Sequence, residues 1–575
     1  MAVVLDGTVP AAVIEVERLR KAYGSTVAVD DVSFSVGAGE IFGVLGPNGA
    51  GKTTTVECVI GLRASDRGSI RVMGLDPIRD REKLHQLVGV QLQASALPGK
   101  LRVGEILDLY RSFYRDAADV GELVGSLGLS DKLGDYYRSL SGGQRQRLSV
   151  MLALIGNPRV AVLDEMTTGL DPQARRETWE LIEAISDRGV TILLVTHFME
   201  EAERLCDRAA LIDHGRIVAL DTPAGLIAQA RGGKQVTFTP SAPFDDGLLL
   251  ALPEVRTVAH DGSVVVVRNR RAGQRGDPRA VRPRRRRPRR GARFLHPGGG
   301  ASHADRTRRR SERSASVSAT TPPLRMTMPP AAFGKIVLNE ARLAWRAPRV
   351  LFLSLGLPTL LLIVFGELPA FQRHKATLGG LTEFNEYVPI LIAMVMVLLG
   401  LLSLPSALVS YREQGILRRL STTPAPPSGV LAAQIVVNLA LALVSMAIIV
   451  IAGIAAFGET APKDAGGFVL AIVLSLAAIF SIGLLIAALV RTSGAAQAIS
   501  TIFFFPLLFF GGLWVPRAQM SAGLRDISGY TPMGAAVQAV QYSIQGTFPP
   551  ATALLTLAGY TVVLGFLATR YFKWE

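Results

Sequence analysis

The chain has 575 residues, a formal net charge of +15, a mean hydropathy of +0.32 and two cysteines. This length has room for three or four domains, and two cysteines exclude a disulfide framework or a cysteine-based metal site. The first 230 residues have an ordinary globular balance, whereas the last 240 contain long apolar runs. We expect no signal peptide, because a basic n-region is missing and Asp6 interrupts the apolar start of the chain.

Residues 46–53 read GPNGAGKT and fit the phosphate-binding loop pattern G-x-x-x-x-G-K-[ST]. Glycines let successive backbone N–H groups turn around a polyphosphate, where a Cβ would clash. Lys52 supplies a charge for the β- and γ-phosphates, and the Thr53 hydroxyl can ligate Mg²⁺. The nucleotide-binding residues predicted for this loop are Gly46, Pro47, Asn48, Gly49, Ala50, Gly51, Lys52, Thr53 and Thr54. The loop alone indicates only that a nucleoside triphosphate binds.

About 90 positions later, residues 140–144 read LSGGQ. The two motifs together resemble the ATP-binding cassette (ABC) ATPases, whose signature sequence is LSGGQ. The resemblance implies an α/β P-loop NTPase fold that hydrolyses ATP. It also implies that the signature residues Ser141, Gly142, Gly143 and Gln144 act on ATP bound to another cassette.

Residues 160–165, VAVLDE, are an apolar run that ends in two carboxylates. This pattern predicts a buried parallel strand that delivers charge at its C-terminal end, where open α/β sheets bind ligands. Asp164 would hold Mg²⁺ as the Walker-B Asp of P-loop NTPases does, and Glu165 fits the general base of the family. An isolated Asp-Glu pair is more often a solvated turn, but its place after a strand favours the catalytic interpretation.

Other positions match the cassette family by resemblance. Asp171 in GLD resembles the D-loop, and His197, after the apolar run ILLVT, occupies the place of the switch histidine that contacts the γ-phosphate. Gln93 matches the Q-loop residue that senses Mg²⁺, with Gln91 as a weaker alternative. Tyr23 lies where the family stacks an aromatic ring on adenine. Met166 departs from the proline of many relatives, and we interpret it as tolerated.

The chain contains a single cassette. Phosphoryl transfer needs charge stabilisation beyond one loop and one metal. In the family, Ser141 and Gly143 of one cassette cap the ATP that Lys52 of the other holds. The chain is therefore expected to pair, most simply with a copy of itself under two-fold symmetry.

The segment after the cassette has two parts. Residues 234–268 begin a small strand-helix-strand-strand unit (KQVTFT, FDDGLLLAL, EVRTVAH, SVVVVR), which drug-export cassettes often carry and which stops here without its closing elements. From Arg268 to Arg313 there are 18 arginines, no lysine and three acids, which accounts for the whole net charge of the chain. Few apolar residues and abundant Pro and Gly predict that this segment is disordered.

Three interpretations of the arginine-rich segment stay open. It is a solvated linker, a contact for anionic lipid or nucleic acid, or the product of a frameshift that joins two adjacent genes. The last is suggested by arginine without lysine among Pro, Gly and Ala, as a GC-rich gene yields out of frame.

The C-terminal part contains six apolar runs long enough to span a membrane, at 350–366, 388–409, 430–457, 468–490, 498–515 and 552–569. With the N-terminus cytoplasmic, ten Lys or Arg residues flank the spans inside and five outside. This bias supports a cytoplasmic cassette.

Three segments beside the spans resemble the ABC-2 permease family. Residues 335–349 form a basic amphipathic stretch similar to its interfacial elbow helix. Residues 411–424, YREQGILRRLSTTP, resemble its coupling segment, which is expected to dock near Gln93. Residues 516–550, with four prolines, are expected to hold short re-entrant helices on the outer side.

We find no Asp, Lys or Arg near the middle of a span; Glu367 lies at an outer end, and the polar exceptions are Gln434, Asn438 and Gln497. Intramembrane ionisable groups usually mark ion pathways, so their absence favours transport driven by ATP, with an apolar or amphipathic cargo. Pro358, Pro405 and Pro506 are expected to bend their helices.

We therefore predict a multidomain chain. An ABC cassette (1–232) is followed by a truncated α+β extension (233–268), an Arg/Pro-rich linker (269–330) and an all-α, six-span ABC-2 permease domain (331–575). The resemblance, which is strongest to daunorubicin-resistance-type cassettes and permeases, implies an exporter of hydrophobic or amphipathic compounds, including drugs, in a bacterial plasma membrane. It would use ATP and Mg²⁺, pair as a homodimer, contact the bilayer and bind no nucleic acid. The alternatives are a lipid or glycan exporter and a regulatory ATPase that moves no cargo.

Overall fold

The structure is a computed structural model that describes residues 12–93, 96–230, 235–240, 245–252, 255–261, 264–269, 329–372 and 382–572. It divides into two compact units, one formed by 1–223 with 326–575 and the other by 224–325. Nearly all of the predicted arginine-rich linker lies outside the described residues.

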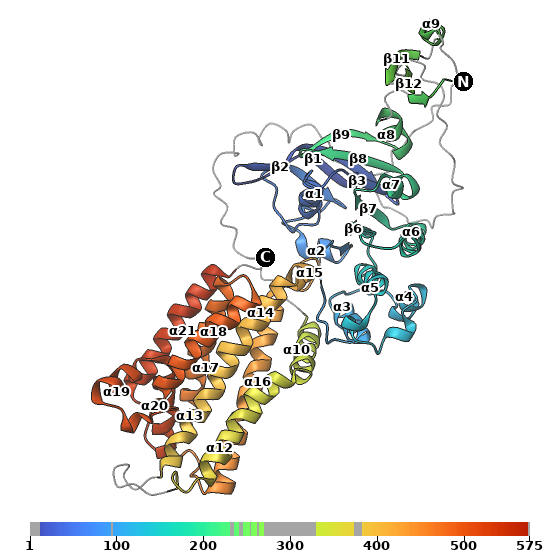
Figure 1. The fold of residues 1–575 in the computed structure, drawn as a ribbon. Coiled ribbons are helices and arrows are strands. Elements are labelled where there is room, and N and C mark those ends of the chain that lie inside the picture. The colour runs from blue at the N-terminus through green and yellow to red at the C-terminus, as the bar shows by residue number, and fades with distance from the viewer. Residues whose placement is uncertain are drawn as a thin grey trace, which may run out of the picture. The chain divides into compact units, whose positions relative to one another are not determined.

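A six-stranded sheet forms the centre of the cassette, in the order β5-β6-β7-β3-β8-β9 (Figure 1). All neighbouring pairs are parallel except β8 and β9. The central strands are apolar and buried on both faces, as expected for a parallel sheet covered by helices. The strands are β3 (Ile41–Leu45), β5 (Val88–Gln91), β6 (Val160–Asp164), β7 (Thr191–Thr196), β8 (Arg208–Asp213) and β9 (Arg216–Asp221).

A second, antiparallel sheet has the order β2-β1-β4, and its inward side chains join the same hydrophobic core as β3 and β6. Its strands are β1 (Ala12–Tyr23), β2 (Thr26–Gly37) and β4 (Arg67–Val72). The helices of the cassette are α1 (Lys52–Val59), α2 (Arg81–His85), α3 (Val103–Arg111), α4 (Val120–Ser126), α5 (Gly142–Leu154), α6 (Pro172–Asp187) and α7 (Met199–Leu205), with short 3-10 turns η1 (Ser130–Lys132) and η2 (Tyr137–Ser139). Helix α8 (Pro223–Ala230) belongs to the second unit except for its first residue.

The second unit contains the elements predicted after the cassette. They are β10 (Gln235–Phe238), α9 (Asp246–Leu250), β11 (Val255–Asp261) and β12 (Val264–Asn269). The strands form an antiparallel sheet in the order β10-β12-β11, so the last strand of the chain segment lies in the middle.

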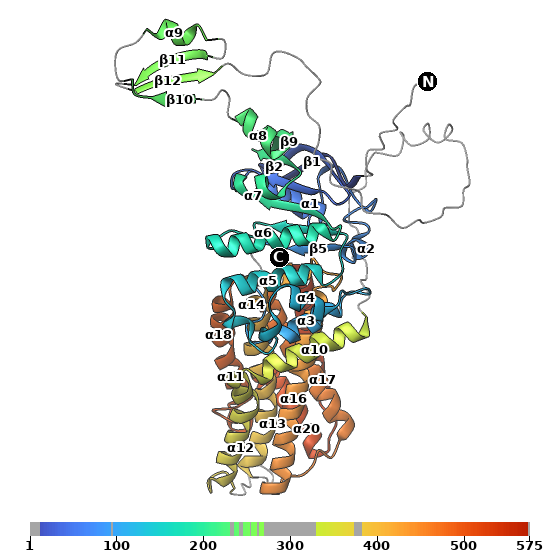
Figure 2. The ribbon, with the colours of Figure 1, turned by 90° about the vertical axis from the view of Figure 1, so that its right-hand side faces the viewer.

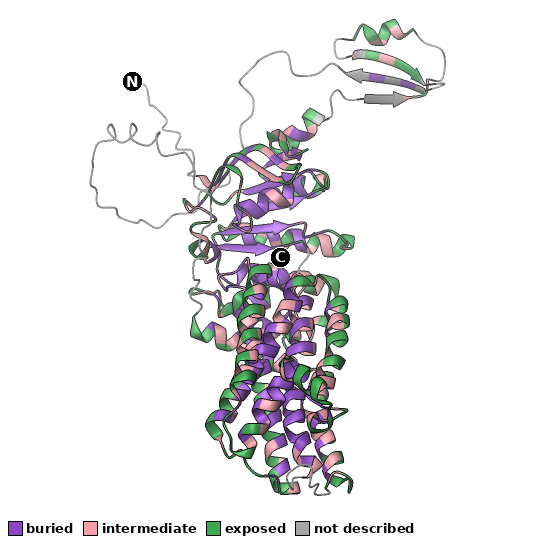
Figure 3. Cartoon of the chain, turned by 90° about the vertical axis from the view of Figure 1, so that its left-hand side faces the viewer, coloured by how far each residue is buried: buried purple, intermediate pink, exposed green. Residues whose placement is uncertain are grey.

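Six helices of the described chain are long and apolar enough to cross a membrane, as predicted. They cover Pro348–Glu367, Glu383–Glu413, Ser428–Phe457, Ala465–Leu489, Ser493–Gly511 and Ala551–Tyr571. In the most apolar 18-residue window of each span, 89% of the second span and 17% of the last are buried, so the second span lies inside the bundle and the last at its surface. Figure 2 shows the bundle from a second side, and Figure 3 shows buried residues inside it and exposed residues on its outer side. In the ribbon these spans are α11 (Pro348–Leu351), η3 (Phe352–Gly356) and α12 (Leu357–Glu367); α13 (Glu383–Val397), η5 (Leu398–Ser403) and α14 (Leu404–Glu413); α16 (Ser428–Phe457); α17 (Ala465–Leu489); α18 (Ser493–Gly511); and α21 (Ala551–Tyr571).

Prolines shape the first two spans. The π-helical turns η3 and η5 end just before Pro358 and Pro405, so the wider turn accommodates a residue that has no N–H and crowds the preceding carbonyl. Pro506 lies inside α18, and Pro389, which was not singled out from the sequence, lies inside α13.

The segments beside the spans are helical. The predicted elbow is α10 (Pro330–Trp345), and the predicted coupling segment contains α15 (Ile416–Leu420). The segment 516–550 forms η6 (Arg517–Gln519), α19 (Ala522–Gly529) and α20 (Pro532–Gln545), and α20 packs against α17 and α13.

Candidate ATP site and its contacts with the membrane domain

The topology brings the predicted site residues together. β6, β7 and β3 are neighbours and parallel, so the residues that follow their C-terminal ends meet at one edge of the sheet. Asp164 ends β6, His197 follows β7, and the loop 46–51 follows β3 and leads into α1.

Close backbone approach requires glycine in the loop. Gly46 and Gly51 have φ values of 148° and 98°, which favour glycine. An ideal Cβ on Gly51 would lie 2.3 Å from the Ala28 carbonyl oxygen, and one on Gly46 would lie 2.1 Å from that of Ile212. The Lys52 ammonium is buried and donates to the carbonyls of Gly46 (2.7 Å) and Pro47 (3.0 Å), which holds it over the loop.

Glu165 is the centre of a polar cluster. Its Oε1 lies 3.9 Å from Lys52 Nζ and 3.5 Å from His197 Nδ1, and Gln93 Nε2 donates to its Oε2. Its φ of 47° is unusual for a residue with a side chain, and such strain is typical of functional sites. The structure therefore places three predicted residues, Lys52, His197 and Gln93, within contact distance of the Glu165 carboxylate.

Asp164 fits a metal ligand. It is 1% exposed, and its Oδ1 has no hydrogen-bond partner among the described residues. Burial and the Glu165 carboxylate raise the pKa of Asp164 to about 6, while the cations of Arg418 and Lys52 act in the opposite direction. A buried, unpartnered carboxylate oxygen beside the loop suits a hard cation. Asp164 would hold Mg²⁺ with Thr53, on the first turn of α1, and with Gln93, and the metal would neutralise phosphate charge.

The structure separates the two glutamines of the Q-loop region. Gln91 is buried, and its Oε1 accepts from the Asp164 backbone N–H at 3.1 Å. It therefore supports the backbone of β6, whereas Gln93 reaches Glu165.

The signature and D-loop residues also stabilise helix starts. Ser141 is the N-cap of α5 in a capping box with Gln144, and Asp171 caps α6 by accepting from the N–H groups of Gln173 and Ala174. Tyr23, at the end of β1, is 41% exposed with Lys21 and Arg63 near its ring. Met166 is buried.

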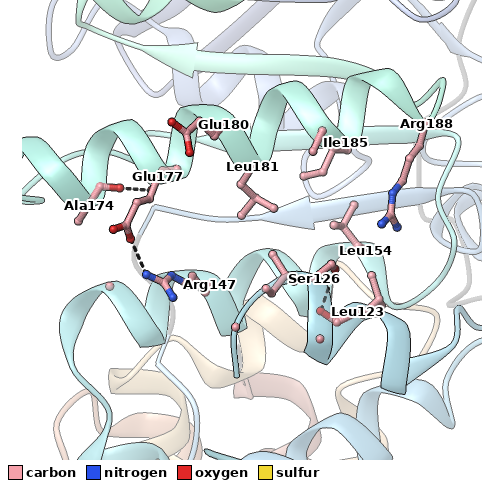
Figure 4. Close-up of a pocket in the computed structure, with 16 residues that line it drawn as sticks. Leu123, Ser126, Arg147, Leu154, Ala174, Glu177, Glu180, Leu181, Ile185 and Arg188 are labelled. Atoms are coloured by element: carbon pink, nitrogen blue, oxygen red, sulfur yellow. Dashed lines mark hydrogen bonds and ion pairs between the residues drawn. The ribbon is translucent and has the colours of Figure 1, made fainter. Parts of the chain in front are cut away.

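A pocket lies between α4, α5 and α6 (Figure 4). Gly143 lines it, and Arg147 Nη2 pairs across it with Glu177 Oε2 at 2.5 Å. Glu177 Oε1 accepts from Gln173 at 3.3 Å. The pocket is apart from the phosphate-binding loop, and its ion pair links the signature helix to the D-loop helix.

The cassette and the membrane domain are joined by several pairs of residues that no motif in the sequence indicates. Arg418 of α15 pairs with Glu57 of α1, Arg346 pairs with Glu105 of α3 at 2.6 Å, and His85 lies against the carbonyl of Thr423. The partners are 241 to 361 positions apart, so no local pattern could reveal them.

Comparison with known proteins identifies the class. Residues 29–168 match the family described as ABC transporter, and residues 332–544 match the ABC-2 type transporter. The chain belongs to the ABC transporter family: it is a multi-pass membrane protein that combines an ATP-binding, ATP-hydrolysing cassette with an ABC-2 type membrane domain, which confirms the family and the fold predicted from the sequence.

Similar proteins match the cassette part of the chain. The Nod factor export ATP-binding protein I of Paraburkholderia xenovorans (strain LB400) is 45% identical over 229 residues, 39% of this chain and 75% of that protein. The protein of the same name from Rhizobium meliloti is 38% identical over 263 residues, 45% of this chain and 78% of that protein. A solved ATP-binding subunit of an ABC transporter is 29% identical, with a TM-score of 0.35, covering 38% of this chain and 93% of that one.

Proposed function

We propose that the chain is an ATP-driven exporter. Two copies would form a homodimer that moves hydrophobic or amphipathic compounds, of the drug or antibiotic class, out of the cytoplasm. The observation that carries this proposal is that one chain joins the Lys52–Glu165–His197 cluster to six apolar helices through direct contacts such as Arg418 with Glu57. The names of bacterial relatives, which refer to export, support the direction.

Each residue of the cluster has a role in hydrolysis. Lys52 and the loop N–H groups bind the β- and γ-phosphates, and Thr53, Gln93 and Asp164 would hold Mg²⁺. Glu165 polarises the attacking water, and His197, 3.5 Å from Glu165, contacts the γ-phosphate. Tyr23 would stack on adenine, and Asp171 would act at the dimer interface.

The signature motif supports pairing of two cassettes. A Cβ on Gly142 or Gly143 would meet no atom of the described chain within 4 Å, so packing within the chain does not demand glycine there. Close approach by a nucleotide bound to a second copy would demand it. The backbone N–H groups of Gly142 and Gly143, at the start of α5, would bind the phosphates of that nucleotide together with the Ser141 hydroxyl, because the N-terminus of a helix attracts anions.

The membrane domain would lie in the plasma membrane of a bacterium with the cassette in the cytoplasm. The ten inner and five outer basic residues support this orientation. Lipid or glycan export is the second candidate, because the relatives' names specify export without a drug.

The test is ATPase activity of the purified chain, compared with Glu165→Gln, across a panel of amphipathic drugs and lipids. Drug-stimulated turnover that disappears in the variant supports a drug exporter. Stimulation by lipids alone supports the second candidate, and turnover independent of Glu165 overturns the proposal.

A further inference from the structure

His85 connects the helix that follows the phosphate-binding loop to the membrane domain. The side chain is fully buried, with Nε2 3.0 Å from the Ile60 carbonyl oxygen and Nδ1 3.1 Å from that of Thr423. Ile60 is the C-cap of α1, and Thr423 follows α15 in the coupling segment. One imidazole therefore lies between the two elements that must communicate.

Both carbonyls need a partner from outside their own helices. Ile60 ends α1, where the last carbonyls have no intrahelical donor. Thr423 precedes Pro424, which has no N–H and cannot continue a helix. Because buried carbonyls are nearly always hydrogen-bonded, these two carbonyls compete for the donor that lies between them.

A neutral imidazole has only one N–H. Burial lowers the pKa of His85 to about 4, and the Arg81 cation acts in the same direction, so the ring is neutral at neutral pH. Its N–H can then donate to Ile60 or to Thr423, but not to both. The hydrogen bond can therefore move from one carbonyl to the other while α1 and the coupling segment both stay folded.

The bridge is part of a larger contact on α1. This helix begins at Lys52, its middle residue Glu57 pairs with Arg418, and its C-cap reaches His85. Arg81, which begins α2, donates to the Ser421 carbonyl at 2.6 Å. A displacement of α1 on nucleotide binding would therefore act directly on residues 418–423.

We propose that His85 is a positioning residue that transmits nucleotide binding at Lys52, through α1, to the coupling segment at Thr423. This route is separate from Gln93, and it rests on the proposed ATP-driven function. His85 contacts α1 through Nε2, which faces the Ile60 carbonyl, and the membrane domain through Nδ1, which faces the Thr423 carbonyl.

Two substitutions separate the two edges. His85→Gln places an amide N–H near the Nε2 position and keeps a donor for Ile60, whereas His85→Asn places one near the Nδ1 position and keeps a donor for Thr423. His214→Gln is the matched control, because that histidine is exposed on the turn between β8 and β9. Each change is made in the full chain carrying Glu165→Gln, reconstituted in lipid nanodiscs.

The measurement is backbone hydrogen exchange of residues 416–423 with and without ATP, alongside direct binding of radiolabelled ATP. We expect ATP to change this exchange in the parent and in the His214 control. Both His85 variants should bind ATP like the parent, but the change in hydrogen exchange that ATP causes should be at least about fivefold smaller than in the parent. Melting temperatures identify a variant that fails to fold. If one of the two His85 variants fails, the hydrogen exchange of the other one tests the proposal.

The outcomes distinguish the two proposals. A full ATP-induced change in a folded His85 variant overturns the transmission role and leaves the exporter proposal intact. A parent chain that binds no ATP overturns the proposed function itself.

Discussion

Glu57, five residues after Lys52 on α1, pairs with Arg418 of α15, so a glutamate next to the nucleotide site contacts an arginine of the membrane domain. Glu57 is 5% exposed and also accepts from Arg63 Nε at 2.5 Å. A buried carboxylate is stable only when it is paired, so two cations from different parts of the chain hold it in place. The contact therefore fixes α15 against the helix that carries the phosphate-binding lysine.

Reversing either charge should weaken this contact. Glu57→Arg puts three cations together, and Arg418→Glu leaves two carboxylates facing each other. We expect each single variant to melt at a lower temperature and to lose about 1 kcal/mol or more of stability. Melting of the full chain in nanodiscs measures both effects.

The double variant Glu57→Arg/Arg418→Glu is the control for that pair. It restores opposite charges, so part of the lost stability should return. A double variant as unstable as the sum of the singles would show that the two side chains do not interact.

Local pattern explains what the sequence could predict. Features that depend on consecutive residues can be identified from the sequence, as the loop 46–53 and the pair Asp164 and Glu165 were. The six spans can be identified because each is a long apolar run. His85, Glu57 and Glu105 were missed because their partners lie far along the chain, and nothing local distinguishes a histidine that joins two domains from one that fills a core. The π-helical turns were missed for a similar reason: the proline predicts a bend but not how the backbone absorbs it.

Arg346, the C-cap of α10, and Glu105 on α3 form a second contact between the domains, with two hydrogen bonds of 2.6 and 2.7 Å. The guanidinium lowers the pKa of Glu105, so this pair stabilises the fold above the ordinary glutamate pKa, and the contribution is lost as the pH falls through the lowered value. Glu105→Gln should cost about 1–2 kcal/mol at pH 7 and progressively less in acid.

Melting curves of the wild type and Glu105→Gln at pH 7 and at the lowest pH the protein tolerates test this expectation. Arg346→Lys is the conservative partner change, and it should lose the two-pronged geometry while keeping the charge. An equal deficit of Glu105→Gln at both pH values would contradict the electrostatic explanation.

Glu340 on α10 is a buried carboxyl, and in the part of the chain that the structure describes its hydrogen-bond partners are neutral groups. Its oxygens accept from the Tyr411 hydroxyl (2.9 and 3.0 Å) and from Gln434 Nε2 (2.5 Å). Burial raises its pKa from 4.5 to about 8. The folded state therefore holds this proton more tightly than the unfolded state, and stability falls as the pH rises from about 4.5 to about 8.

Glu340→Gln removes this pH dependence, because an amide does not ionise and its oxygen can still accept from Gln434 and Tyr411. The variant should gain on the order of 1–3 kcal/mol relative to the wild type at pH 9 and little at pH 5, measured by melting across that range. Glu203→Gln, at an exposed position of α7, is the control and should show no such trend. A constant difference between Glu340→Gln and the wild type would mean that Glu340 does not titrate in this window.

Two glycines should respond oppositely to the same added methyl group. Gly51→Ala forces a Cβ against the Ala28 carbonyl at a φ of 98°, so we expect a loss of about 1–3 kcal/mol of stability and weaker ATP binding.

A Cβ on Gly142 meets no described atom within 4 Å, so Gly142→Ala should melt like the wild type. If the signature of one copy caps the ATP of another, Gly142→Ala should nonetheless lower ATPase turnover at least tenfold, or roughly 1.4 kcal/mol of transition-state stabilisation, because the methyl group blocks an approach that only the dimer makes. Normal turnover in Gly142→Ala would remove the support that this glycine gives to a shared ATP site, and normal ATP binding in Gly51→Ala would show that the loop relaxes around the added atom.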